Sequence, residues 1–385
     1  MLLNSVGMMG ENVVLGWLTL ELTNSPFMVG VALGMRMLPM FFIGVPAGAL
    51  ADRFPRHRLL MLTGAGQALT TATLGGFVLM GTVSLAHVLV LTLAAGAFRA
   101  LEHAARQSYT HDVVGPGALM NGFAILGVAM RIGWLVGSLG VGALIARYGS
   151  GIAYLVVSLG FLAGALAVLP VSAPATAGAP PLLSVWHSTL EFFMAVRRDR
   201  MLLVLMMLTA GAEILGFAHQ ALLPSLARDV LHTGPEGLGV LGAARSAGGI
   251  LGLATAAAAG GVTAAGGARF LAVLVTFGAS LVVLGAAPYI VGFAGVVIVL
   301  IVVNAAGALA DLQAQSLMQL SVPDALRGRA GGAWVVAIGL APLGQMQMGA
   351  LASLFGVSVA LGTSGVALVV VATATGLLFP RMKRT

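Results

Sequence analysis

The sequence has 385 residues, of which 59% are hydrophobic and only 8% are charged, and its mean hydropathy is +1.03. A soluble domain carries about 25% charged residues, so this chain has too little polar surface for a water-soluble protein. The net charge of +7 does not indicate nucleic-acid binding, because the basic residues are spread over the ends of apolar runs. The absence of cysteine excludes disulfides, zinc–thiolate sites and iron–sulfur clusters.

The apolar runs are long enough for membrane-spanning helices, which need about 20 residues each. The short alternating segments typical of barrel strands are not seen in the sequence. We therefore predict an all-α integral membrane protein with twelve transmembrane helices in two pseudo-symmetric halves of six. The predicted spans are 1–22, 27–51, 59–80, 84–110, 119–146, 151–170, 201–227, 236–260, 268–287, 290–320, 328–354 and 357–379.

The basic residues fall mainly on one side of such a chain. The positive-inside rule makes that side cytoplasmic, so both termini are predicted to be cytoplasmic. The other side carries only Arg147 and Arg228. The residues that set the bias are Arg53, Arg56, Arg58, Arg106, Arg197, Arg198, Arg200, Arg269, Arg327, Arg329, Arg381, Lys383 and Arg384.

A spacer divides the spans six from six. We predict an N-terminal half over residues 1–170, a cytoplasmic linker over 171–200, a C-terminal half over 201–379 and a cytoplasmic tail over 380–385. Residues 182–200 are expected to form an amphipathic helix at the membrane interface, although a plain linker would suit the same fold. Met1 falls inside the first span, so we expect either a start codon further upstream or a shortened first span.

The turn between the predicted second and third spans, Gly48-Ala-Leu-Ala-Asp52-Arg53-Phe-Pro-Arg56-His-Arg58, holds one acid and three arginines within a few residues. It resembles the signature loop between the second and third spans of the major facilitator superfamily. The resemblance implies that Gly48, Asp52, Arg53, Arg56 and Arg58 form a gating motif on the cytoplasmic side. A role in topology alone would explain the three arginines, but it would not explain Asp52 or Gly48.

Other stretches resemble the drug-exporter and enterobactin-exporter-like branch of that superfamily. This resemblance implies alternating access around a central cavity, with export of a hydrophobic drug-like compound or siderophore-like metabolite against inward proton flow. Twelve spans alone would equally suit an importer or facilitator of a small metabolite or lipid, and a non-transporting sensor or scaffold could keep the fold. The stretches are Trp17-Leu-Thr-Leu-Glu21-Leu-Thr-Asn-Ser-Pro26, Arg36-Met-Leu-Pro39, Ala105-Arg-Gln-Ser108 and Gln319-Leu-Ser-Val-Pro-Asp-Ala-Leu-Arg-Gly-Arg329.

Several positions depart from the superfamily pattern. Pro55 and His57 replace the glycine and the basic residue usual in the loop, and Glu102 and His103 replace the usual Gln and Gly of the fourth span. The corresponding loop between the eighth and ninth spans, residues 252–269, lacks an acid. These departures weaken the prediction of an antiporter with two symmetric gates.

Ionisable side chains inside a bilayer are costly and are therefore functional candidates. In the fourth span, Arg99, Glu102, His103 and Arg106 fall on one helical face. Glu102 and His103 could relay protons while Arg99 tunes their affinity for them. A structural ion pair near the cytoplasmic mouth would explain the same spacing.

Glu11 lies in the middle of the first span. It resembles the acidic residue common in the first span of drug exporters, where it takes a proton or a cationic substrate. The alternative is a structural partner for Arg36 or Arg131.

In the C-terminal half, Asn304, Asp311 and Gln315 share a face of the tenth span that is predicted to point into the cavity. Glu213 is predicted to do the same from the seventh span. Each of these acids could hold a proton or sit in a buried pair. Arg245 could bind an anionic group or satisfy a helix contact.

Two histidines, His87 and His219, are interpreted as membrane-interface residues rather than ligands. No enzyme constellation, phosphate-binding loop or metal-ligand spacing is found in the sequence. We therefore expect a transporter that is not an enzyme, uses no cofactor or metal and binds no nucleic acid. Its expected partners are a small-molecule substrate, protons and the lipid of a bacterial inner membrane, and by analogy it is expected to be a monomer.

Overall fold

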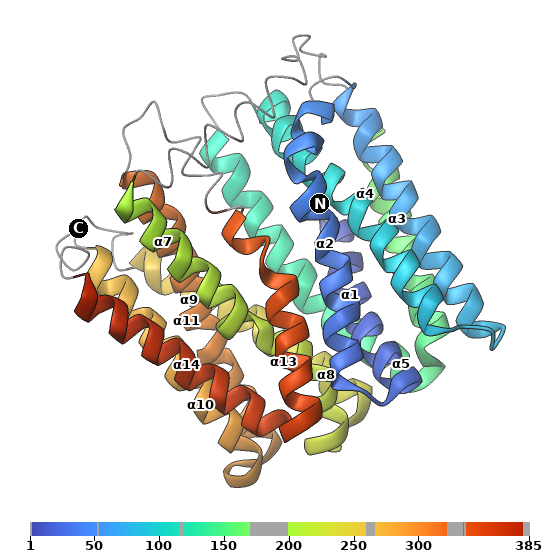
Figure 1. The fold of residues 1–385 in the computed structure, drawn as a ribbon. Helices are drawn as coiled ribbons and strands as arrows, with labels where there is room; N and C mark the ends of the chain where they lie inside the picture. Colours follow the sequence, from blue (N-terminus) through green and yellow to red (C-terminus); the bar gives the residue numbers. More distant parts are fainter. Residues whose placement is uncertain are drawn as a thin grey trace. The chain divides into compact units, whose positions relative to one another are not determined.

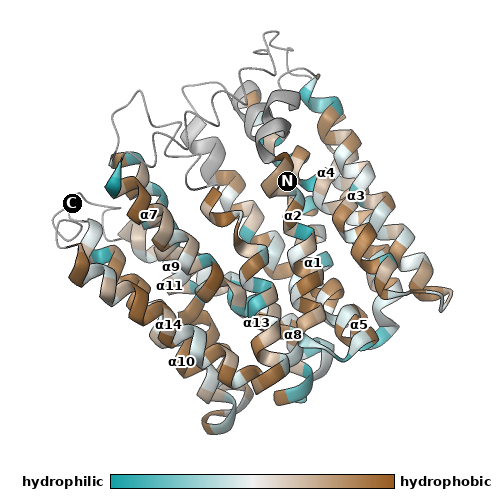
Figure 2. Ribbon diagram, in the orientation of Figure 1, coloured by the Kyte–Doolittle hydropathy of each residue, from teal (hydrophilic) through white to brown (hydrophobic). Residues whose placement is uncertain are grey.

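The computed structural model describes residues 2–51, 54–114, 119–169, 199–258, 266–321, 334 and 336–379. Within these ranges the chain is built of helices and the turns that join them (Figure 1). Hydrophobic residues run along the helices, while hydrophilic ones gather towards helix ends (Figure 2). The all-helical membrane fold predicted from composition is thereby confirmed.

The N-terminal helices follow the predicted spans closely. They are α1 (Leu2–Thr23), α2 (Pro26–Ala51), α3 (Arg56–Leu79), α4 (Leu85–Val114) and α5 (Leu119–Leu166). α5 covers the predicted fifth and sixth spans together. These spans are separated by a break at Gly149, whose φ of 81° lies in the left-handed region that favours glycine.

The C-terminal helices also fall on the predicted spans. The predicted seventh span, however, is not a uniform α-helix: it contains two π-helical stretches and a 3₁₀ stretch. The segments are α7 (Arg200–Gly211), η2 (Ala212–Gly216), η3 (Phe217–Leu222), α8 (Leu223–Ser225), η4 (Leu226–Val230), α9 (Gly234–Ala258), α10 (Gly266–Ile290), α11 (Gly292–Leu320), α13 (Ala341–Phe355) and α14 (Val357–Leu378).

Eight helical segments of the described ranges are long and apolar enough to cross a membrane by length and composition alone. One of them, Ile125–Leu166, is 42 residues long and contains both spans of α5. The protein is therefore a multi-pass membrane protein.

The chain divides into two compact units. Unit 1 comprises Met1–Asn24, Ala32–Ser188 and Thr233–Ala243, and unit 2 comprises Ser25–Val31, Thr189–His232 and Ala244–Thr385. In unit 1, α1 and α3 both pack along α5, and α3 also packs on α4. In unit 2, α10 packs between α11 and α14, and α13 packs against η2 and η3.

Glycines allow the helices of each unit to approach closely, as small residues do in membrane proteins. In unit 1, a β-carbon at Gly137 of α5 would collide with the backbone of Val6 in α1.

Hydrogen bonds join the end of α1 to α5 beyond the break at Gly149. Glu21 accepts them from Trp17 Nε1 (2.6 Å) on α1 and from Ser150 Oγ (3.0 Å) on α5.

In unit 2, α10 and α14 cross at two facing glycines. A β-carbon on Gly365 would lie 2.5 Å from the carbonyl oxygen of Gly278, and one on Gly278 would lie 2.6 Å from the carbonyl oxygen of Gly365. Because both obstacles are backbone atoms, the helices would have to separate to admit a methyl group.

We predict that Gly365→Ala destabilises the protein, because overpacking a tight contact costs about 1–3 kcal/mol. Gly362 lies on the same helix with nothing within 4 Å of its β-carbon position, so Gly362→Ala is the matched control. Thermal unfolding of the purified protein in detergent should show a lower Tm for Gly365→Ala and no decrease for Gly362→Ala. Equal melting temperatures for the two variants would contradict this assignment of the crossing.

Candidate functional site

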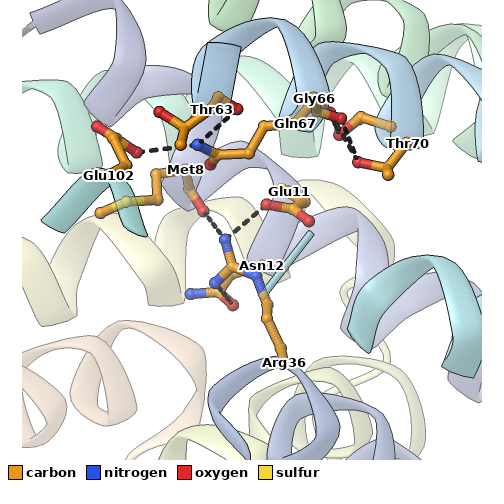
Figure 3. A network of polar contacts seen from close by, with 10 residues as sticks. Met8, Glu11, Asn12, Arg36, Thr63, Gly66, Gln67, Thr70 and Glu102 are labelled. Carbon is orange, nitrogen blue, oxygen red and sulfur yellow. Dashed lines mark hydrogen bonds and ion pairs between the residues drawn. The ribbon is translucent and has the colours of Figure 1, made fainter. Parts of the chain in front are cut away.

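A buried ion pair joins α1 to α2 in unit 1. Arg36 Nη2 donates to Glu11 Oε2 at 2.6 Å, and both side chains are almost completely buried. The same guanidinium donates to Asn12 Oδ1 at 2.5 Å and to the carbonyl oxygen of Met8 at 3.1 Å (Figure 3). Of the two partners considered for Glu11 from the sequence, the structure thus supplies Arg36.

A second buried carboxylate, Glu102, is held between α3 and α4. Glu102 Oε1 accepts a hydrogen bond from Arg106 Nη1 at 2.9 Å, one helical turn along α4. Its other oxygen, Oε2, accepts one from Gln67 Nε2 of α3, also at 2.9 Å (Figure 3). Gln67 is 1% exposed and was not among the candidates from the sequence, although an amide inside an apolar span is a signal that could have found it.

Arg99 and His103 complete the polar face of α4. Gly96, one turn before Arg99, lies directly against the backbone of Arg36, since a β-carbon there would collide with the Arg36 carbonyl oxygen. Arg99 lies within electrostatic range of Arg36, Glu11 and Glu102. The sequence-predicted residues of the first, second and fourth spans therefore lie within electrostatic range of one another.

The remaining N-terminal candidates lie elsewhere. Arg131 is half-buried on α5. Of the gating motif, Gly48 belongs to α2, Arg56 is the first residue of α3 and Arg58 is exposed. Asp52 and Arg53 lie outside the described residues, as do the linker over 171–198 and the tail over 380–385.

In unit 2, a smaller polar group surrounds the π-helical stretch η2. Glu213 lies on η2, within electrostatic range of Asp311 on α11 and Arg245 on α9. Asp311 Oδ1 accepts a hydrogen bond from Trp334 Nε1 at 2.9 Å. These three charged candidates are thus brought together, and Trp334 is a member that sequence reasoning missed.

His219 and Asn304 form a separate contact in unit 2. His219 is 1% exposed, so its interpretation as a membrane-interface residue is wrong. Its Nδ1 lies 2.8 Å from the carbonyl oxygen of Gly216 and its Nε2 lies 3.4 Å from Asn304 Nδ2. His219 lies on the 3₁₀ helix η3, which places its ring at these contacts. A hydropathy pattern does not distinguish a 3₁₀ helix from an α-helix, so the sequence did not predict this position. Gln315 is half-buried further along α11.

π-Helical turns inside a helix occur frequently at functional sites, and buried ionisable groups in membrane helices mark substrate or proton pathways. Both units therefore contain chemistry suited to binding protons or a polar substrate group. No group of three or more His, Asp or Glu side chains among the described residues is arranged to hold a metal ion.

Comparisons with known proteins identify solved structures with the same fold. The chain resembles, in fold, a bacterial homologue of the human lysosomal transporter Spinster in an inward-facing, unoccupied conformation, with a TM-score of 0.73, 16% identity and coverage of 100% of this chain and 94% of the other. It also resembles the nucleoside transporter NupG (TM-score 0.74, 13% identity, coverage 98% and 99%). A third similar structure is a POT family transporter in complex with 5-aminolevulinic acid (TM-score 0.80, 11% identity, coverage 99% and 94%).

A search of curated proteins finds no match to the sequence. The sequence profile of the Major Facilitator Superfamily, in contrast, matches residues 1–345, which is most of the chain. Together with the helical fold, this match shows that the protein is a membrane transporter of the Major Facilitator Superfamily.

Proposed function

We propose that the protein is a proton-coupled secondary transporter that exports a hydrophobic drug-like or siderophore-like compound by alternating access. The observation that carries the proposal is the buried pair between Glu11 and Arg36. A carboxylate can accept a proton, whereas arginine stays protonated. Protonation of Glu11 would therefore remove one half of the pair and leave Arg36 with Asn12 and the Met8 carbonyl.

This change would alter the link between α1 and α2. A buried ion pair is strongly destabilised when one partner loses its charge, so proton binding would favour another arrangement of these two helices. A conformational change driven in this way needs a ligand that binds two states differently, and here the ligand is the proton. Glu102, His103, Glu213 and Asp311 are further candidates for the same role in the two units.

Export and its cargo rest on the sequence stretches that resemble drug and enterobactin exporters. The same resemblance supports a bacterial inner membrane as the location. The distribution of basic residues supports cytoplasmic termini, and the pattern of apolar runs supports a cytoplasmic linker over 171–200 between halves 1–170 and 201–379. The resemblance to the superfamily's signature loop supports a gating motif formed by Gly48, Asp52, Arg53, Arg56 and Arg58. An importer is the second candidate. The observation that favours it is the surplus of guanidinium groups around Glu11 and Glu102, since such a surplus suits an anionic substrate.

We predict that Glu11→Gln abolishes proton-coupled transport. The measurement is pH inside proteoliposomes loaded with pyranine, after a panel of fluorescent hydrophobic compounds is added under a pH gradient. The variant leaves a buried guanidinium without its carboxylate, which costs about 3–5 kcal/mol, so its Tm should also fall.

The double variant Glu11→Gln with Arg36→Gln separates coupling from folding. Removal of both charges should restore much of the Tm, while proton coupling should stay lost. Retained proton coupling in either variant would exclude Glu11 as the proton carrier. The absence of transport by the wild-type protein over the whole panel would instead favour a sensor or scaffold.

We predict that Asp52→Asn slows transport severalfold without changing expression or membrane insertion, if the loop after α2 acts as a gate. Asp229→Asn is a matched control, because Asp229 is a surface carboxylate paired with Arg228 at 2.7 Å. Transport rates are normalised to the amount of protein in the vesicles, and Asp52→Asn should transport more slowly than Asp229→Asn. An Asp52→Asn variant as fast as the control would leave topology as the only role of the loop.

A further inference from the structure

Six buried polar atoms of the described residues in unit 1 have no hydrogen-bond partner, and three of the six lie around the pair of Glu11 and Arg36. These three are Arg36 Nε on α2, Arg99 Nη1 on α4 and the hydroxyl of Tyr154 on α5. Arg36 is 3% exposed and Tyr154 is 1% exposed. A buried donor without an acceptor is costly, so three of them in one region call for a ligand.

The three groups face a common region. Gly96 lies against the backbone of Arg36, and Arg99 follows Gly96 by one helical turn, so Arg99 is on the face of α4 that meets α2. Arg99 lies within electrostatic range of both Arg36 and Glu11. Tyr154 lies within electrostatic range of the same two residues.

The carboxylates of this network already have partners. Glu11 accepts from Arg36, and Glu102 accepts from Arg106 and Gln67. Among the side chains that the structure describes, Arg36 and Arg106 bind these two carboxylates, and no oxygen accepts a hydrogen bond from Nη1 of Arg99. His103, also on α4 and near Arg99, adds no negative charge.

We propose that Arg36, Arg99 and Tyr154 form a binding site for an oxyanion, a carboxylate or phosphate group carried by the transported substrate. The planar guanidinium group can donate hydrogen bonds to two oxygens of a carboxylate or a phosphate, and a phenol donates a further hydrogen bond. Arginine side chains buried in a membrane protein face a substrate pathway rather than lipid. The assignment deepens the second candidate function, import of an anionic substrate, and rests on transport by this protein for its physiological meaning.

The site also has a consequence for coupling. The groups within electrostatic range of its members are Glu11 from α1 and Glu102, His103 and Arg106 from α4, and Gln67 of α3 is bound to Glu102. An anion placed among them repels the two carboxylates and so favours proton binding by one of them. Anion and proton then bind together, which suits their movement in the same direction and favours the second candidate function, import, over export against inward proton flow.

The test uses three aromatic probes that share one ring system: 2-naphthoate, 2-naphthyl phosphate and the neutral 2-naphthamide. Their binding to the full-length protein in a non-ionic detergent is measured by naphthalene fluorescence, and proton uptake or release is measured in an unbuffered solution. The wild-type protein should bind at least one anion about tenfold more tightly than the amide, with net proton uptake. The naphthoate and phosphate arms distinguish the two kinds of oxyanion.

Arg99→Gln should remove the preference for the anion and the proton uptake while leaving amide binding unchanged. Arg99→Lys keeps the charge and should retain part of the preference, which guards against a simple folding defect. Arg147→Gln is the matched control. Arg147 is an exposed arginine of α5 whose guanidinium lies over the ring of Tyr148, so this variant should behave like wild type.

Equal affinity for the amide and both anions, or an Arg99→Gln variant that keeps the preference, would overturn the proposal. Proton release on anion binding would overturn the predicted coupling. A protein that binds the anions with the expected preference but transports nothing in proteoliposomes would support the site and contradict the proposed transport function, so the two failures are distinguishable.

Discussion

The salt bridge between Glu11 and Arg36 sets the constraint on which the N-terminal unit depends. Charges inside a bilayer are tolerated only where they are paired and hydrogen-bonded within the protein, and Arg36 meets this condition with Glu11, Asn12 and the Met8 carbonyl. Breaking one partner of such a pair costs about 3–5 kcal/mol. In the proton-coupled transport that we propose, protonation of Glu11 would break this pair and favour another arrangement of α1 and α2.

Close helix packing is the condition that makes this network possible. Hydrophobic burial gives membrane helices little reason to associate, because lipid is as apolar as their side chains. Here small residues bring backbones into contact, as at Gly137 against Val6 and at Gly96 against Arg36. The second of these contacts also carries Arg99 towards the ion pair, so the same glycine that permits packing positions a charge.

The two units use different means to place their polar groups. In unit 1 the polar residues project from regular α-helices. In unit 2 they depend on departures from the α-helix, since Glu213 lies on a π-helical stretch and His219 on a 3₁₀ stretch of the same span. Irregular backbone at membrane depth is tolerated where it is enclosed by protein, and η2 and η3 are both covered by α13.

The sequence by itself determined the helical membrane class, the positions of the spans and the superfamily, because hydropathy, charge and the loop after α2 are local properties of the chain. It also identified most of the charged candidates, since a bilayer makes every intramembrane charge conspicuous. Only the tertiary structure decided their partners: Arg36 for Glu11, Gln67 for Glu102 and Trp334 for Asp311. It likewise buried His219, against expectation. These pairings join residues from different helices, and helical periodicity fixes the face of a residue within one helix but not which other helix that face meets.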